Sequence, residues 1–214
     1  MSDEFKLFGY QGSGSAAVEA ALELLRLPYR RIDAATWDAK SALDELRRHN
    51  PLQQIPTLQF ADGRAMSESA AILIELGLRF PASALLPSDP ARRAQSIRGL
   101  VYIAANCYAM IGVIDYPERV LDAPSVAEIE RLRQRSRARL YELWDAFADQ
   151  FPALPWLGGD AIGALDLLAT VVSKWSGTRA HLAASRPALS ALFARVEAQP
   201  IVSTVFARHW PAVP

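Results

Sequence analysis

The sequence predicts an α/β unit followed by an all-helical unit, and two observations support this. Strand-like and helix-like segments alternate through about the first 79 residues, whereas every periodic segment after Pro90 has helical spacing. The stretch between them, RFPASALLPSDP, has three prolines and little periodicity, which is typical of a linker. We expect units at residues 1–79 and 91–214, joined by a linker over 80–90.

The first unit is predicted to begin with a strand, a helix and a second strand. Residues 6–10 are apolar and aromatic, and residues 15–27 have apolar side chains at helical spacing until Pro28. Residues 29–33 form the second predicted strand. This order and spacing predict a βαβ unit with a parallel strand pair.

The same unit then continues with a polar helix over residues 40–48 and a strand over 56–60. Asp62-Gly63 is a strong hairpin signal, so Ala65 and Met66 are expected to return antiparallel to that strand. A helix over residues 69–78 closes the unit.

The second unit contains only helical signals. Ser125 and Glu128 form a capping box that opens a helix ending near Gln150. The other predicted helices cover residues 91–114, 164–176 and 187–199.

Composition restricts the class of protein. The 23 basic and 23 acidic side chains balance, which argues against a nucleic-acid partner, and we see no uninterrupted apolar run of about 18 residues for a membrane. The start MSDEFK does not resemble a signal peptide, so a cytoplasmic location is expected. One cysteine, Cys107, excludes an intramolecular disulfide and a CxxC pair. His49, His181 and His209 lack metal-ligand spacing and are expected at the surface without a metal.

Two stretches are candidates for chemistry. In GYQGSGSAAVEAAL, a serine could cap the helix or present its hydroxyl at the positive end of the helix dipole. In NPLQQIPTLQFADGRAMSES, a cis Ile55-Pro56 bond would leave the Ile55 main chain free to pair with an extended peptide, whereas a trans proline would only begin a strand. Glu68 and Ser69 could bind the amine and carboxylate of an amino acid, or could only cap the helix.

These segments, in this order, resemble the soluble glutathione S-transferase superfamily, and in particular a bacterial-like, serine-type member. The resemblance extends over essentially the whole chain and is most specific in NPLQQIPTL, SESAAI and GSGSAAVEAALELLRLPYR. It implies a thioredoxin-like glutathione-binding domain over residues 1–79. It also implies an all-helical domain over 91–214 that supplies the electrophile pocket.

The resemblance implies a role for each glutathione-binding residue. Ile55 and Pro56 match the cis-proline dipeptide that pairs with the cysteinyl backbone of glutathione. Glu68 and Ser69 match the pair that holds the γ-glutamyl group, and Gln53 falls where a side chain reaches the glycyl carboxylate.

The catalytic hydroxyl in this resemblance is that of Ser13, which would support the glutathione thiolate, the reactive species. Ser15 is then the more natural helix cap, although the two serines could exchange roles. Gly14 occupies the position of the cysteine in cysteine-type members, which disfavours a mixed-disulfide mechanism. Tyr10 is close to the tyrosine of another branch but lies within the predicted strand.

Other implied roles are in the helical domain. Tyr108 faces the substrate cleft, Asn106 is near the position that reaches a neighbouring subunit's glutathione, and Trp210 is a candidate to cover the cleft. Cys107 is expected in the core or cleft wall. The family's Ser/Thr-x-x-Asp box before one helix is replaced here by Gly163-Ala164-Leu165-Asp166.

The resemblance implies a homodimeric detoxification enzyme in which the glutathione thiolate attacks a small hydrophobic electrophile. Glutathione is a co-substrate, and no metal is needed. A glutathione-dependent isomerase, lyase, dehalogenase or peroxidase on the same fold remains an alternative, as does a non-catalytic binding or regulatory protein.

Overall fold

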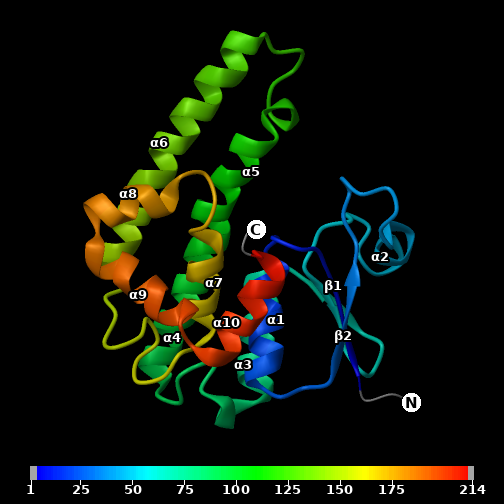
Figure 1. The fold of residues 1–214 in the computed structure, drawn as a ribbon, viewed down its shortest axis with the longest axis vertical. Coiled ribbons are helices and arrows are strands. Elements are labelled where there is room, and N and C mark those ends of the chain that lie inside the picture. Colours follow the sequence, from blue (N-terminus) through cyan, green and yellow to red (C-terminus); the bar gives the residue numbers. More distant parts are fainter. Residues whose placement is uncertain (1–3, 212–214) are drawn as a thin grey trace.

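The computed structural model describes residues 4–211 and contains a four-stranded sheet beside a larger group of helices (Figure 1). The strands occur in the order β2-β1-β3-β4. β1 pairs parallel with β2 and antiparallel with β3, and β3 pairs antiparallel with β4. The predicted parallel pair and hairpin are therefore confirmed. The strands are β1 (Phe5–Gly9), β2 (Tyr29–Asp33), β3 (Thr57–Gln59) and β4 (Ala65–Ser67).

Helices cover both faces of this sheet. The helix α2 packs through Leu46 against Phe8 on one face, while α1 and α3 lie between the sheet and the other helices (Figure 1). The helix α1 ends three residues before its predicted end because the chain already turns at Arg26, which has a left-handed φ of 54°. These helices are α1 (Ser15–Leu24), α2 (Leu43–His49) and α3 (Ser69–Arg79).

The rest of the chain is helical, as the sequence predicts. The capping box at Ser125 and Glu128 is present at the start of α6. The short helices α8 and α10 have no counterpart among the predicted elements. The elements are η1 (Pro81–Ser83), α4 (Pro90–Tyr102), η2 (Ile103–Tyr108), α5 (Ala109–Asp115), η3 (Pro117–Arg119), α6 (Val126–Gln150), α7 (Ala164–Val172), α8 (Thr178–Ser185), α9 (Pro187–Glu197) and α10 (Pro200–His209).

The predicted single helix over residues 91–114 is interrupted, and η2 in its middle is π-helical. A π-helical turn widens the ring of each backbone hydrogen bond, so later side chains leave the helix in a different direction. Within it, the Asn106 side chain donates to the Tyr102 carbonyl at 3.1 Å. This turn sets the direction of Tyr108.

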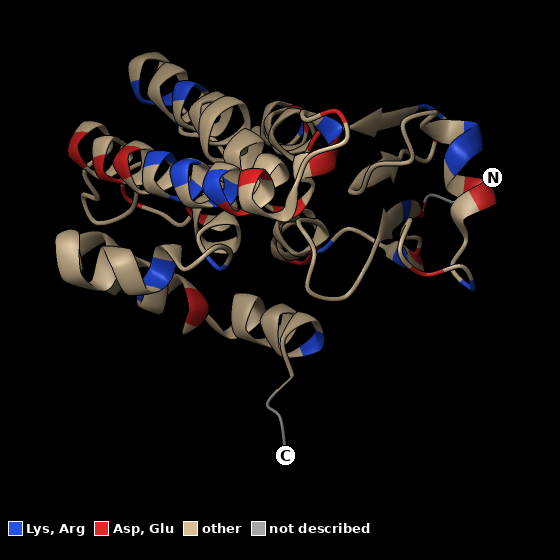
Figure 2. Cartoon of the chain, turned by 90° about the horizontal axis from the view of Figure 1, so that it is seen from above, with Lys and Arg blue, Asp and Glu red and all other residues tan. Residues whose placement is uncertain are grey.

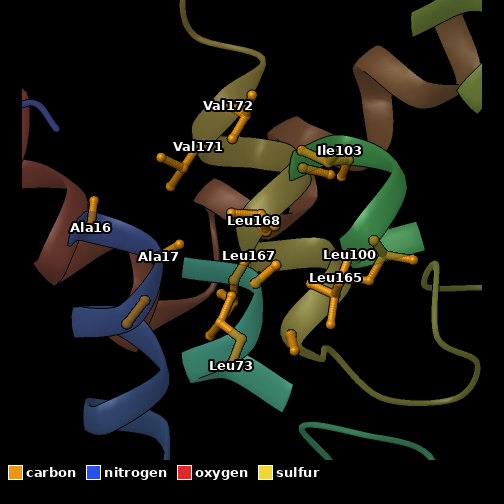
Figure 3. Packing of buried hydrophobic residues seen from close by; sticks show 14 of the residues in the cluster. Ala16, Ala17, Leu73, Leu100, Ile103, Leu165, Leu167, Leu168, Val171 and Val172 are labelled. Atoms are coloured by element: carbon orange, nitrogen blue, oxygen red, sulfur yellow. The ribbon is translucent and has the colours of Figure 1, made fainter. Parts of the chain in front are cut away.

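The core is centred on α7, whose nine residues are all buried. Leu167 and Leu168 of this helix lie between α1 and the π-helical turn, close to Ala17 and Leu73 (Figure 3). The small side chains of Ala16 and Ala17 let α1 approach α7 closely. Burying each leucine of this core contributes about 2 kcal/mol.

The structure at the start of α7 explains why position 163 has a glycine in place of the serine or threonine of the family's box. A Cβ on Gly163 would lie 2.8 Å from the Leu85 carbonyl oxygen, so serine or threonine does not fit there. That same carbonyl accepts from the Ala164 amide at 2.8 Å. The buried Asp166 carboxylate accepts from the amides of Leu157 and Gly163 at 2.9 and 3.0 Å.

One helical run, Pro90–Asp115, is long enough to cross a membrane and contains an 18-residue window that is apolar enough by composition, with a mean hydropathy of 1.6. The sequence expectation missed it because it considered only uninterrupted apolar runs. The run contacts α6 and α7, as a helix of a folded helical unit does. Elsewhere, acidic and basic residues are interspersed over the helices and the sheet side (Figure 2).

Candidate active site

A cavity of about 560 Å³ lies between the loops at one end of the sheet and the helices η2 and α5. Its sheet-side wall contains six residues of the predicted site: Ser13, Gln53, Ile55, Pro56, Glu68 and Ser69. Its helical wall contains Tyr108. Residues from distant parts of the sequence therefore meet at one cavity.

Ser13 lies in the loop before α1 and borders the cavity, whereas Ser15 is fully buried. The Ser13 hydroxyl donates to the Tyr10 carbonyl at 2.7 Å and accepts from the Ser15 amide at 3.2 Å. Ser15 does not cap α1, so that expectation is wrong. Its Oγ instead accepts from the Tyr10 amide at 3.3 Å and lies 2.8 Å from the Ser13 oxygen.

The Ile55-Pro56 bond is cis, as predicted. The loop before it is held by Asn50, which is 5% exposed. The Asn50 side chain donates to the Gln54 carbonyl at 3.0 Å and to the Thr57 hydroxyl at 3.1 Å. Asn50 thus fixes the loop that brings Gln53 and Ile55 to the cavity, a positioning role that the sequence analysis did not assign to it.

Two residues of the cavity have a positive φ although neither is glycine. The φ of Gln53 is 54° and that of Glu68 is 68°. Such conformations cost about 1–3 kcal/mol each and tend to occur at functional sites. Glu68 directly precedes α3, so its side chain, the Ser69 hydroxyl and the first amides of the helix lie at one edge of the cavity.

Tyr108 approaches the start of α1 from the helical side. A Cβ on Gly14 would collide with its hydroxyl, so the absence of a side chain at position 14 makes room for the tyrosine. Burial, and then the carboxylates of Asp115 and Glu68, raise the pKa of Tyr108 to about 12. Within residues 4–211 no group hydrogen-bonds to this hydroxyl, which leaves a protonated donor at the cavity.

The helical wall is otherwise largely apolar and aromatic. Tyr108 and Trp175 are neighbours, with ring centroids 5.6 Å apart. Tyr116 and Ile111 also border the cavity, and the Arg119 guanidinium lies 3.9 Å from the centre of the Tyr116 ring. None of these four cavity residues was predicted, because their spacing in the sequence carries no signal of a shared cavity.

Other predicted residues lie away from the wall of the cavity. Asn106 is bonded within the π-helical turn, and Trp210 packs on Phe206 at a centroid distance of 5.1 Å. The Tyr10 hydroxyl donates to Asp38 at 3.0 Å. Cys107 is buried, as expected, and burial raises the pKa of its thiol to about 12.

The expectation that all three histidines lie at the surface is wrong for His209, which is 2% exposed and bonded to Glu19. His181 is half-buried and stacks on Tyr141, and His49 packs beside Phe8. No local pattern marks His209, because its partner is 190 residues away. Among the described residues, no group of three or more potential ligands could hold a metal ion.

Comparison with known proteins agrees with this geometry. Residues 15–79 match the family model described as "Glutathione S-transferase, N-terminal domain". The uncharacterized GST-like protein YncG of Escherichia coli is 33% identical over 172 residues, which are 79% of this chain and 81% of that protein.

Two further matches concern isomerases and the fold. A probable maleylacetoacetate isomerase 1 of Drosophila melanogaster is 45% identical over 104 residues, 47% of this chain and 42% of that one. A glutathione transferase homologue from Sulfitobacter, solved with bound glutathione, has a TM-score of 0.84 at 21% identity and covers 95% of this chain and 97% of that one. The chain therefore belongs to the glutathione S-transferase superfamily.

Proposed function

We propose that this protein is a glutathione transferase in which the Ser13 hydroxyl supports the glutathione thiolate. The observation that carries the proposal is the convergence of Ser13, the Ile55-Pro56 dipeptide and the Glu68-Ser69 pair on one cavity. Residues 1–79 would bind glutathione, 80–90 would link the units, and 91–214 would supply the electrophile pocket. Residues 1–3 and 212–214 lie outside the described structure.

Each part of glutathione has a chemically matched partner at the cavity. The γ-glutamyl group, which has an amine and a carboxylate, matches Glu68 and the start of α3 at Ser69. The peptide backbone matches the main chain of Ile55, and the glycyl carboxylate matches the Gln53 amide. The sulfur is then directed toward Ser13.

Ser13 is suited to donate a hydrogen bond to sulfur. Its oxygen accepts from the Ser15 amide at the start of α1, which polarises the O–H bond. The positive end of the α1 dipole favours a negative charge at the same place. The hydroxyl now donates to the Tyr10 carbonyl, so a rotation about its Cβ–Oγ bond would redirect its proton to the thiolate.

The remaining properties follow from the same proposal. A small hydrophobic electrophile would bind between Tyr108, Tyr116 and Trp175, and the reaction would serve detoxification in the cytoplasm. Asn106 and Trp210 would act only at the edge of this site. A homodimer would bury the exposed side chains of Leu78 and Val101.

The test is the pH titration of thiolate absorbance in the glutathione complexes of Ser13→Ala and Ser15→Ala. We expect Ser13→Ala to raise the thiolate pKa and to lower the rate at neutral pH by about one to two orders of magnitude. Ser15→Ala should mainly lower thermal stability, because its hydroxyl is buried. A titration that moves only in Ser15→Ala would reassign the catalytic serine, and one that moves in neither would contradict the proposal.

A second candidate is a glutathione-dependent isomerase acting on a dicarboxylate. The similarity to a probable maleylacetoacetate isomerase favours it, as does the cationic Arg119 at the cavity. Turnover of maleylacetoacetate that fails in Arg119→Gln, with turnover of a neutral electrophile unchanged, would favour the isomerase over the general transferase.

A further inference from the structure

The last described helix reaches the loop that precedes α1. In Figure 1, α10 lies directly beside α1, although 175 residues separate them. The contact includes two buried polar side chains, Glu19 of α1 and His209 of α10, each 2% exposed. The His209 Nε2 atom lies 2.8 Å from a Glu19 carboxylate oxygen.

The other ring nitrogen of His209 points to the loop. The Gly12 amide donates to His209 Nδ1 at 3.2 Å. Because an amide N–H can only donate, Nδ1 is unprotonated and the ring proton lies on Nε2. The ring therefore donates to Glu19 and accepts from Gly12, so each bond fixes the tautomer that the other needs.

Glu19 is held as a charged acceptor by further partners. Arg208 donates to its second oxygen at 3.0 Å, the Tyr29 hydroxyl donates at 3.1 Å, and Arg31 lies 3.6 Å away. These are the charged and titratable groups that face His209 through Glu19. Lys174 faces the neighbouring Trp210 ring at 4.6 Å.

Gly12 is enclosed by the same end of α10. Its φ of 71° lies in the left-handed region that favours glycine. A Cβ there would lie 3.6 Å from the His209 carbonyl oxygen and 3.7 Å from the Trp210 indole nitrogen. The end of α10 thus packs on the residue next to Ser13.

We propose that Glu19 and His209 are positioning residues that fix the loop carrying Ser13 through the Gly12 amide. The effect on catalysis rests on the proposed function, whereas the effect on the loop does not. His209 touches neither glutathione nor the sulfur in this proposal. It acts by holding the backbone from which the Ser13 hydroxyl projects.

Two variants of His209 each keep one of its two hydrogen bonds and remove the other. In His209→Gln the terminal amide replaces Nε2, so the bond to Glu19 is kept and the acceptor for Gly12 is lost. In His209→Asn the side-chain oxygen replaces Nδ1, so the Gly12 bond is kept and the Glu19 bond is lost. Val205→Ala, a buried truncation on the same helix, controls for a general loss of stability.

The primary measurement is hydrogen exchange of the Gly12 amide by NMR. We expect exchange about five- to tenfold faster in His209→Gln, as the loss of one hydrogen bond predicts, and little changed in His209→Asn and Val205→Ala. The thiolate pKa of bound glutathione should rise in His209→Gln alone. Equal Gly12 exchange in His209→Gln and Val205→Ala would overturn the proposal.

Two further results test the role of His209 separately from the proposed function. Long-range ¹H–¹⁵N spectra of the wild-type His209 ring should show a proton on Nε2 alone, and a proton on Nδ1 would overturn the proposal without any variant. A wild-type glutathione complex with an unshifted thiolate pKa would contradict the proposed function, while the Gly12 exchange rates would still decide the role of His209.

Discussion

The hydroxyl of Tyr108 occupies the space in which a side chain at Gly14 would begin. A Cβ at this glycine would collide with the hydroxyl oxygen but would lie 3.4 and 3.5 Å from the ring atoms Cζ and Cε2, which are ordinary contacts. The φ and ψ of Gly14 are −61° and −14°, values that any residue adopts. The hydroxyl of Tyr108 is therefore the atom that excludes a Cβ at position 14.

The first prediction concerns this pair. Gly14→Ala should destabilise the protein by about 1–3 kcal/mol through overpacking, because the backbone itself accepts alanine. In a Tyr108→Phe background the same substitution should cost less than about 1 kcal/mol. Urea unfolding of the four proteins of this cycle measures the coupling. Equal costs in both backgrounds would mean that the tyrosine moves aside freely.

The second prediction is a pH dependence at Glu19. Burial would raise the pKa of this carboxyl, but the hydrogen bonds from His209 and Arg208, together with the charge of Arg208, outweigh burial and lower it to about 2. A carboxyl with a lowered pKa stabilises the fold above its unfolded pKa and loses that contribution as the pH falls. Wild type should exceed Glu19→Gln by about 3 kcal/mol at pH 7, and the difference should shrink below pH 4.5. A difference that stays constant from pH 7 to pH 3 contradicts this.

The third prediction concerns Asp166, whose contribution to stability should depend on pH in the opposite direction to that of Glu19. Burial raises the pKa of Asp166 to about 6, although the amides of Leu157 and Gly163 oppose the shift. The folded carboxyl then keeps its proton where the unfolded one has lost it, so its contribution to stability falls as the pH rises from about 4 to 6. The stability advantage of wild type over Asp166→Asn should therefore narrow across this window, as measured by unfolding at each pH. A widening difference would show that the amide bonds outweigh burial.

The fourth prediction concerns assembly. Leu78 on α3 and Val101 on α4 are 52% and 51% exposed, and the two helices are in contact. We expect sedimentation at twice the chain mass of 23.5 kDa, and a monomer for Val101→Glu. Val126→Glu introduces the same charge at an exposed valine at the start of α6 and should remain a dimer. A wild-type monomer at micromolar concentration would contradict the prediction.

Local sequence patterns were sufficient to predict most helices and strands and the residues of the sheet-side wall of the cavity. Asp62-Gly63 predicts the hairpin, and the Ser125 capping box marks the start of α6, because both depend on neighbours in the sequence. The stretches around Ile55 and Glu68 predict residues that do meet at the cavity.

The sequence did not predict the π-helical turn or two features that depend on contacts between distant residues. The π-helical turn at η2 has no hydropathy signature, since the apolar spacing continues through it. His209 can be buried because it bonds to Glu19. Position 163 is a glycine because the Leu85 carbonyl leaves no room for a Cβ. Each of these contacts joins segments at least 78 residues apart, a separation over which periodicity carries no information.

The bond between Gly12 and His209 also has a consequence for synthesis on the ribosome. Domains generally fold from the N-terminus as the chain emerges, so the sheet and α1 are available long before α10 exists. Until residue 209 has left the exit tunnel, the Gly12 amide lacks its acceptor and Glu19 lacks two of its partners, Arg208 and His209. The loop that carries Ser13 is therefore completed only after residue 209 has emerged, and a nascent chain that ends before His209 lacks this part of its site.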